Sequence, residues 1–274
     1  MATIAVYAGH GGADSGAVSG NLREKDFNLA ISNAVSSILR GWGYTVINNR
    51  TTDVNRSITQ DANLANDRRA NAVVEIHMNS NEGTPGTGSE AFVSIRDTSQ
   101  RNGQARSLSN AILTRLAALG FRNRGVFTSI NASGQDTFGI LRLTNMPAVL
   151  LEVAFINNPQ DMSRLNVNTA AMAIAEGIRQ MYPLSGGGGN TGGSFPPFPG
   201  VTMRQGSQGE SVRQIQRCIN RISAREAALG RLTEDGNFGP RTRCVVMTFQ
   251  CLQGLNPDGL VGPITWAALT RECG

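Results

Sequence analysis

The sequence predicts an α/β protein with a mostly parallel sheet flanked by helices, followed by a small all-α domain of three helices. Short apolar runs alternate with amphipathic segments over most of the chain, which is typical of parallel sheets crossed by helices. A glycine- and proline-rich stretch follows at residues 185–200, and two similar turns punctuate the remainder. We therefore expect domains at residues 1–184 and 201–274, joined by a linker at 185–200.

The first domain contains the alternating elements. Its apolar runs predict strands at residues 4–8, 44–48, 72–77, 89–95, 138–143 and 148–153. Apolar residues at helical spacing predict helices from Glu24 to the glycine at 41, over 57–71, from Ala105 to a stop before Gly120, and over 170–181. In such folds, ligands lie beyond the carboxyl ends of the strands.

The second domain is predicted to be helical. Val212, Ile215, Ile219 and Ile222 form one apolar face, and Ser211 can cap the helix that carries them. The pattern Asp-Gly-x-x-Gly-Pro-x-Thr occurs at 235–242 and again at 258–265, each time ahead of a helix. Because this half shows no metal or nucleophile pattern, binding is favoured over catalysis.

Composition limits the partners. The chain has 274 residues, 40% of them hydrophobic and 16% charged, and lacks an apolar run long enough to span a membrane. No basic segment precedes an apolar one at the N-terminus, so we expect no signal peptide, and action outside the cytoplasm would need another route of export. A net charge of +5 favours an anionic partner, but only 5% of residues are aromatic and none interleave with clustered arginines, which argues against nucleic acid.

The two histidines of the chain each follow an apolar run. His10 comes after the first predicted strand, His77 ends the third, and Glu24 opens the helix after His10. Two histidines and a carboxylate with a fourth position open form a catalytic zinc pattern. A histidine that closes a strand is more often a packing residue, but here both histidines occupy such ends. Zinc is therefore the expected cofactor.

Four motifs of the first domain resemble the amidase 3 family of zinc-dependent N-acetylmuramoyl-L-alanine amidases. They are Gly-His-Gly-Gly-x-Asp-Ser-Gly-Ala at 9–17, Glu-Lys-Asp at 24–26, Ile-His-x-Asn-Ser at 76–80 and Pro-Ala-Val-Leu-Leu-Glu-x-x-Phe-Ile-x-Asn-Pro at 147–159. The resemblance covers about residues 2–182. It implies a hydrolase that cuts the amide between N-acetylmuramic acid and L-alanine of peptidoglycan.

The resemblance assigns roles to residues of this sequence. It implies that His10, Glu24 and His77 are the zinc ligands and that Glu152 is the catalytic carboxylate. The residues support this independently, because Glu152 ends an apolar strand where a charge has no structural purpose. The alternative for Glu152 is an ion pair with a nearby arginine.

Two further residues are candidates for contacts near the substrate. Asn79 belongs to the motif of His77. Glu75 stands where the family often has serine, and strand alternation places it on the same face as His77. Glu75 could contact the ring of His77 without contacting the metal, face the substrate, or pair with an arginine. The loop at 81–88 is too short for the helix that blocks the zinc in some family members, so we expect an open site.

The last part of the chain is similar to the peptidoglycan-binding domain 1 family, through segments 206–216, 235–242, 249–250 and 258–266. The expected partner is therefore peptidoglycan, with no nucleic acid and no membrane span, and the expected state is a monomer acting at the cell wall. Two alternatives remain open: a zinc peptidase that cuts within the stem peptide, and a wall-binding protein without catalysis.

All four cysteines, at positions 218, 244, 251 and 273, lie in the second domain. On one continuous helix, the α-carbons of Cys244 and Cys251 would be about 10.5 Å apart, beyond the roughly 7 Å limit for a bridge. If the cysteines form disulfides, we expect Cys218 to pair with one of these two and Cys273 with the other. The alternative is four reduced thiols.

Overall fold

The computed structural model describes residues 2–83, 85–184, 195–226 and 228–273, which form two compact units. The first unit is built on a six-stranded sheet in the order β4-β1-β5-β8-β6-β7. The strands are β4 (Thr45–Ile47), β1 (Thr3–Ala8), β5 (Ala72–Asn79), β8 (Ala148–Phe155), β6 (Ser89–Val93) and β7 (Asn123–Phe127). Strands β4, β1, β5 and β8 run parallel, while β6 pairs antiparallel with β8. The predicted α/β fold with a mostly parallel sheet is confirmed.

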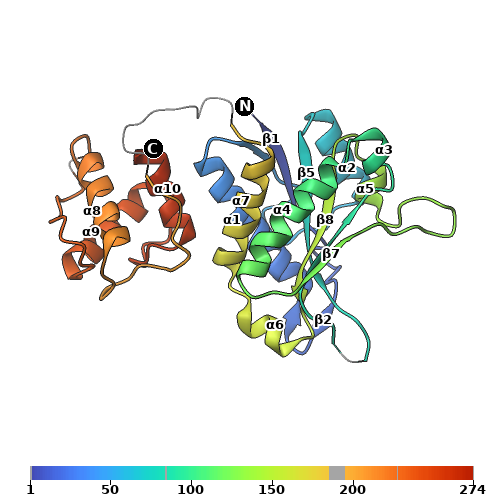
Figure 1. The fold of residues 1–274 in the computed structure, drawn as a ribbon, viewed down its shortest axis with the longest axis horizontal. Helices are drawn as coiled ribbons and strands as arrows, with labels where there is room; N and C mark the ends of the chain where they lie inside the picture. Colours follow the sequence, from blue (N-terminus) through green and yellow to red (C-terminus); the bar gives the residue numbers. More distant parts are fainter. Residues whose placement is uncertain (1, 84, 185–194, 227, 274) are drawn as a thin grey trace. The chain divides into compact units, whose positions relative to one another are not determined.

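Helices cover both faces of this sheet (Figure 1). On one face lie α1 (Glu24–Gly41), α4 (Gln104–Ala118) and α7 (Val167–Met181). On the other lie α2 (Ile58–Asp67) and α5 (Gly139–Leu143), which enclose a small apolar core with the facing side chains of β1, β5 and β8. Two short helices, α3 (Asp97–Gln100) and α6 (Pro159–Arg164), and a hairpin of β2 (Val18–Ser19) and β3 (Leu22–Arg23) complete the unit.

Two predicted elements of the first unit are wrong in type or extent, and one strand was missed. The strand expected at 138–143 is the helix α5, because a short apolar run is equally compatible with a buried helix. The helix expected over 57–71 ends at Asp67, after which Arg69 adopts a positive φ of 48°. Strand β7 was missed, because its sequence around Gly125 has little apolar alternation.

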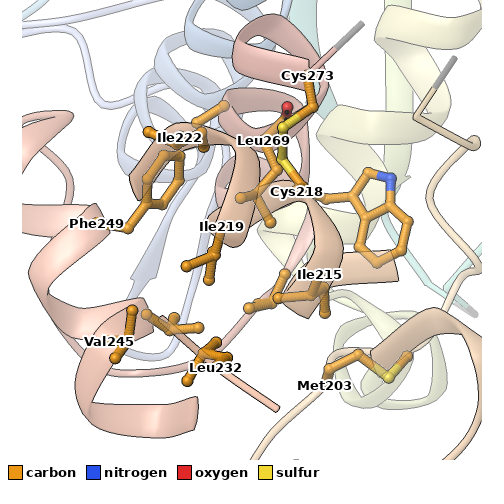
Figure 2. Packing of buried hydrophobic residues seen from close by; sticks show 14 of the residues in the cluster. Met203, Ile215, Cys218, Ile219, Ile222, Leu232, Val245, Phe249, Leu269 and Cys273 are labelled. Carbon is orange, nitrogen blue, oxygen red and sulfur yellow. Dashed lines mark hydrogen bonds between the residues drawn. A yellow bond between two sulfur atoms is a disulfide. The ribbon is translucent and has the colours of Figure 1, made fainter. Parts of the chain in front are cut away.

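The described part of the second unit contains three helices, as predicted: α8 (Glu210–Ser223), α9 (Pro240–Leu252) and α10 (Pro263–Cys273). Its core gathers the apolar faces of all three (Figure 2). The expected cap is wrong, because α8 begins at Glu210 after Gly209 and Ser211 lies within its first turn. Residues 185–194 of the expected linker lie outside the described residues.

The cysteine pairing also differs from expectation. Cys218 of α8 is bonded to Cys273 at the end of α10, with their α-carbons 5.7 Å apart (Figure 2). Cys244 and Cys251 are free and exposed on the continuous helix α9. The exclusion of a bridge between these two is confirmed, but the expectation that each pairs with Cys218 or Cys273 is wrong. The error came from assuming two bridges, whereas α9 turns both of its thiols to solvent.

The repeated turn owes its shape to a buried glutamine of the preceding helix. The amide nitrogen of Gln216 donates to Asp235 Oδ1 at 2.9 Å and to the carbonyl of Asn237 at 3.0 Å, while its oxygen accepts from the Gly236 N–H at 2.8 Å. Gln250 makes the same contacts to the second copy, with Asp258 Oδ1, the Leu260 carbonyl and the Gly259 N–H. The repeat in sequence is therefore a repeat in hydrogen bonding.

Replacing Gln216 with leucine is expected to destabilise the second unit by about 1–3 kcal/mol, because the turn loses three hydrogen bonds and the buried Gly236 N–H is left without its acceptor. Hydrogen exchange of the α8 and α9 amides in the full chain measures this separately from the first unit. Gln205, which is exposed, provides the matched control. Equal protection in the Gln216→Leu and Gln205→Leu variants would contradict the assigned role of the buried amide.

Candidate metal centre

The candidate centre lies at the carboxyl ends of the parallel strands, where β1 and β5 end beside the start of α1. The backbone turns sharply after β1, and His10 adopts a positive φ of 60°, which is uncommon for a residue other than glycine. His77 lies near the end of β5, and Glu24 is the first residue of α1. Three segments far apart in sequence thus bring the predicted ligand residues together.

Ligand atoms of the three residues lie within 4.8 Å of one another. Oε1 of Glu24 is 3.3 Å from His10 Nε2 and 2.9 Å from His77 Nδ1. A zinc ion about 2.0–2.2 Å from each ligand in tetrahedral geometry requires ligand–ligand separations of roughly 3.3–3.6 Å. The arrangement and its nitrogen and oxygen donors therefore fit a divalent metal ion.

Glycines make this close approach possible. A Cβ atom on Gly9 would lie 2.2 Å from the His77 ring, and one on Gly16 would lie 2.5 Å from Glu24 Oε2 and 2.6 Å from the His10 ring. Gly16 also has a positive φ of 61°. Any larger side chain at either position would push a ligand residue out of place.

In each histidine, the ring nitrogen that is not the candidate ligand lies near a carboxylate. His10 Nδ1 contacts Asp14 Oδ2 at 2.8 Å, and His77 Nε2 lies 3.4 Å from Glu75 Oε2. A carboxylate at the far nitrogen of a metal-binding histidine fixes its tautomer and ring orientation. Among the described residues, no arginine forms an ion pair with Glu75, so the arginine alternative considered for this residue finds no support.

Burial and these contacts shift the pKa values of the centre. Burial raises the pKa of Glu24, but hydrogen bonds from His10 and His77 outweigh it and hold that pKa well below its usual value. Burial alone would lower the pKa of His77, but the carboxylates of Glu24 and Glu75 raise it well above its usual value. These shifts arise because carboxylates gather around the histidines, and the same carboxylates favour a bound cation.

Glu152 lies beside His77, its direct neighbour across the β5 and β8 pairing. Burial raises its pKa to about 7, with the nearby carboxylates adding to the shift. Its Oε2 atom is buried without a hydrogen-bond partner among the described residues. The arginine ion pair considered as an alternative is thus not seen there, and the carboxyl group can exchange a proton near neutral pH.

Asn79, at the end of β5, is held by Glu90, because its side-chain nitrogen donates to Glu90 Oε1 at 2.6 Å. Glu90 lies opposite Glu152 in the β6 and β8 pairing and binds the Arg124 guanidinium. Asn79 also lines the cavity above the centre. Its amide orientation is therefore fixed by residues on the neighbouring strands.

A cavity of about 470 Å³ opens over the centre and is lined by His10, Glu24, His77, Glu75 and Glu152. It continues between α2 and α5, past side chains such as Ile58 and Phe138, which supply apolar walls. Residues 81–83 and 85–88 contain no helix. An open centre, as expected from the short loop, is thus present in the described part of the chain.

Sequence reasoning missed the residues that fix the turn carrying His10. Arg50, only 4% exposed, donates to the carbonyls of Ala8 at 3.2 Å, Gly9 at 3.0 Å and Lys25 at 3.0 Å. Asp14 was visible as part of a motif, four residues after His10, but its contact with the ring was not foreseen. Arg50 gave no such signal, because it lies in a segment that resembles an ordinary polar loop.

Asn28 is another supporting residue that was missed. Its side-chain nitrogen donates to the Gly9 carbonyl at 3.1 Å and to Glu24 Oε1 at 3.2 Å. The available signal was its position one helical turn after Glu24, which puts both side chains on the same face of α1. Asn28 therefore ties the ligand carboxylate to the turn between β1 and His10.

Comparison with known proteins gives consistent matches to both units. Residues 4–181 match the N-acetylmuramoyl-L-alanine amidase family, and residues 208–269 match the peptidoglycan binding domain family. N-acetylmuramoyl-L-alanine amidase LytC of Bacillus subtilis is 35% identical over 185 residues, covering 66% of this chain and 35% of LytC. The endolysin of Bacillus phage SPP1 is 34% identical over 194 residues, covering 69% of this chain and 68% of the endolysin.

Solved structures agree with these matches. The catalytic domain of CwlV, an N-acetylmuramoyl-L-alanine amidase from Bacillus (Paenibacillus) polymyxa, superposes with a TM-score of 0.59 at 30% identity. That match covers 68% of this chain and 100% of the CwlV domain. Among the described residues, no helix is long and apolar enough to cross a membrane.

Proposed function

Because the chain belongs to the N-acetylmuramoyl-L-alanine amidase family, we propose that it hydrolyses the amide bond between N-acetylmuramic acid and L-alanine in peptidoglycan. The observation that carries this proposal is the group of His10, Glu24 and His77 with the buried Glu152 beside it in one open cavity. The resemblance seen in the sequence motifs extends to the whole first unit. The site of action is the cell wall.

Each residue of the centre has a distinct role in this proposal. His10, Glu24 and His77 would hold a zinc ion, which would polarise the scissile carbonyl as a Lewis acid and make a bound water molecule more acidic. Glu152 takes the proton of the attacking water and returns it to the leaving amine of L-alanine. A carboxyl group with a pKa of about 7 can do both near neutral pH. Asn79 binds the substrate at the cavity wall.

Mass spectrometry of peptidoglycan digested by the protein tests the reaction. The amidase should release stem peptides that keep a free N-terminal L-alanine, and glycan strands that keep the lactyl group. A peptidase that uses the same centre within the stem peptide would instead leave L-alanine attached to the glycan. A wall-binding protein without catalysis would release nothing and give no clearing in a zymogram.

We propose that Glu75 supports His77 by accepting a hydrogen bond at Nε2 while Nδ1 faces the metal. Replacing Glu75 with serine, the residue the family often has there, is expected to weaken zinc binding by about 10–100-fold. Competition with a chromophoric chelator measures the Kd. Glu82→Ser removes the same charge from an exposed position of the loop after β5 and is the control. An unchanged Kd with a raised KM would show instead that Glu75 faces the substrate.

Residues 1–184 are proposed to act as the catalytic domain and residues 201–274 as a wall-binding domain, within a monomer. Ending the chain before Ser185 should leave a folded hydrolase with undiminished turnover of soluble muropeptides. On intact walls, its activity should fall by about tenfold or more, because the second domain raises the effective concentration of substrate. Turbidity assays on purified walls compare the two forms. Equal rates on intact walls at all salt concentrations would contradict this division of labour.

A further inference from the structure

The second unit contains a cavity of about 640 Å³ that no part of the proposed reaction uses. One wall is a face of α8 carrying Gln214, Arg217 and Arg221, which follow one another at helical spacing. Arg231 and Glu234, in the segment between α8 and α9, also line the cavity. This volume lies within the range of small-molecule sites.

Positive charge is in excess in this cavity. Arg217 is already paired, because its Nη1 lies 3.1 Å from Glu210 Oε1 and its Nε lies 3.5 Å from Glu234 Oε2. The guanidinium groups of Arg221 and Arg231 form no hydrogen bond or ion pair with any other described residue, and both side chains are exposed. Two fork-shaped donors are therefore free to bind a planar anion.

An apolar wall closes one side of the cavity. Phe195 and Pro196 line it, and Phe195 is only 5% exposed. The Phe195 ring packs on Trp266 with centroids 4.8 Å apart, and the Trp266 indole N–H donates to the Pro196 carbonyl at 2.8 Å. These contacts fix the wall against α10, so the cavity is formed in advance of any ligand.

The lining residues include no histidine, cysteine, serine or threonine, so the cavity offers no nucleophile and favours binding. We infer that it binds a carboxylate of the peptidoglycan stem peptide through Arg221 and Arg231, with an adjacent peptide side chain against Phe195 and Pro196. This inference rests on the proposed function, in which peptidoglycan is the substrate. In uncut peptidoglycan the lactyl carboxyl of muramic acid forms the amide bond to L-alanine. The free carboxylates therefore belong to the stem peptide.

Gln214 adds a second type of contact. Its side-chain amide makes no hydrogen bond to another described residue and lies on the same face of α8 as Arg221. An amide of this kind can both donate to and accept from a peptide group. The combination of two guanidinium groups, one amide and an apolar wall thus suits a short acidic peptide better than a neutral sugar.

The test is a binding assay on the full chain carrying Glu152→Gln, which slows digestion of the polymer during the experiment. Purified peptidoglycan, stripped of teichoic acid, is pelleted with increasing protein to obtain a Kd. Adding Arg221→Ala and Arg231→Ala together should raise this Kd by about tenfold or more, since bonds between charged groups are the strong ones. Arg204→Ala with Arg271→Ala removes the same charge from exposed positions outside the cavity and should change it little.

Three further arms identify the ligand. In the first arm, the carboxylates of peptidoglycan are converted to amides. The chain that keeps Arg221 and Arg231 should bind this amidated polymer weakly, with a Kd similar to that of the double variant for untreated polymer. A soluble stem tripeptide should compete, and peptide-free glycan bearing lactyl carboxylates should not. Circular dichroism checks that the variants remain folded.

Several outcomes would overturn the inference. These are an equal loss of binding in the two double variants, no loss in either, competition by peptide-free glycan alone, or binding that requires teichoic acid. None of them bears on catalysis, because the amidase proposal fails only if the wild-type enzyme releases no stem peptides that begin with L-alanine.

Discussion

Replacing Glu152 with glutamine is expected to lower turnover by at least about 100-fold while leaving the metal bound. The loss corresponds to the usual contribution of general acid and base catalysis. Glutamine has nearly the shape of glutamate but cannot accept and return a proton at pH 7. The change therefore removes the proton transfer and keeps the packing at the end of β8.

The structure gives Glu152 the properties this role needs. Its Oε2 atom is buried and unpartnered within the described part of the chain, and burial raises its pKa to about 7. A carboxylate kept only for structure would be paired, as Glu90 is with Arg124. Glu152 lines the same cavity as the ligand residues.

Rates on a soluble muropeptide and the zinc content of the purified protein together measure the effect of Glu152→Gln. Glu176→Gln is the matched control, because it makes the same chemical change on α7, where the side chain pairs with Arg115 at 3.5 Å. Loss of zinc from the Glu152 variant, with a normal rate once zinc is supplied, would show that Glu152 is a ligand and that its assigned role is wrong.

The sequence predicted that the main residues of the centre lie together, because most of them sit at strand ends. Parallel strands deliver their carboxyl ends to one edge, so His10 and His77 could be placed together without knowing any contact between them. The same logic placed Glu152 beside them, and the register of β5 with β8 makes it the direct neighbour of His77. Periodicity also located the long helices to within a few residues.

The parts that could not be predicted depend on contacts between segments distant in sequence. Arg50 stabilises the turn at Gly9 through hydrogen bonds, and only folding brings these two segments together. The stretch at 138–143 forms a helix because of where it packs, against α2 and β8, and its composition allows either structure. The disulfide pairing could not be predicted for the same reason, because the exposure of Cys244 and Cys251 depends on how α9 is oriented in its domain.

Removing the metal is expected to abolish hydrolysis while leaving the fold of the first unit intact. Each proposed ligand is also needed to activate water, so a chelator such as EDTA should reduce activity to background. The ligand residues have protein contacts of their own. Asp14 is hydrogen-bonded to His10, and Asn28 to Glu24. Arg50 donates a hydrogen bond to the Gly9 carbonyl, in the turn between β1 and His10.

Circular dichroism and activity, followed on one chelated sample, separate these two effects. Many structural zinc domains unfold without metal, but this unit has a large core around its sheet that does not depend on the centre. One equivalent of zinc should restore full turnover. Magnesium should not, because it prefers oxygen ligands to the imidazole nitrogens of His10 and His77. Full activity in a sample shown to be free of metal would end the zinc proposal, and unfolding on chelation would show that the metal also stabilises the turn at His10.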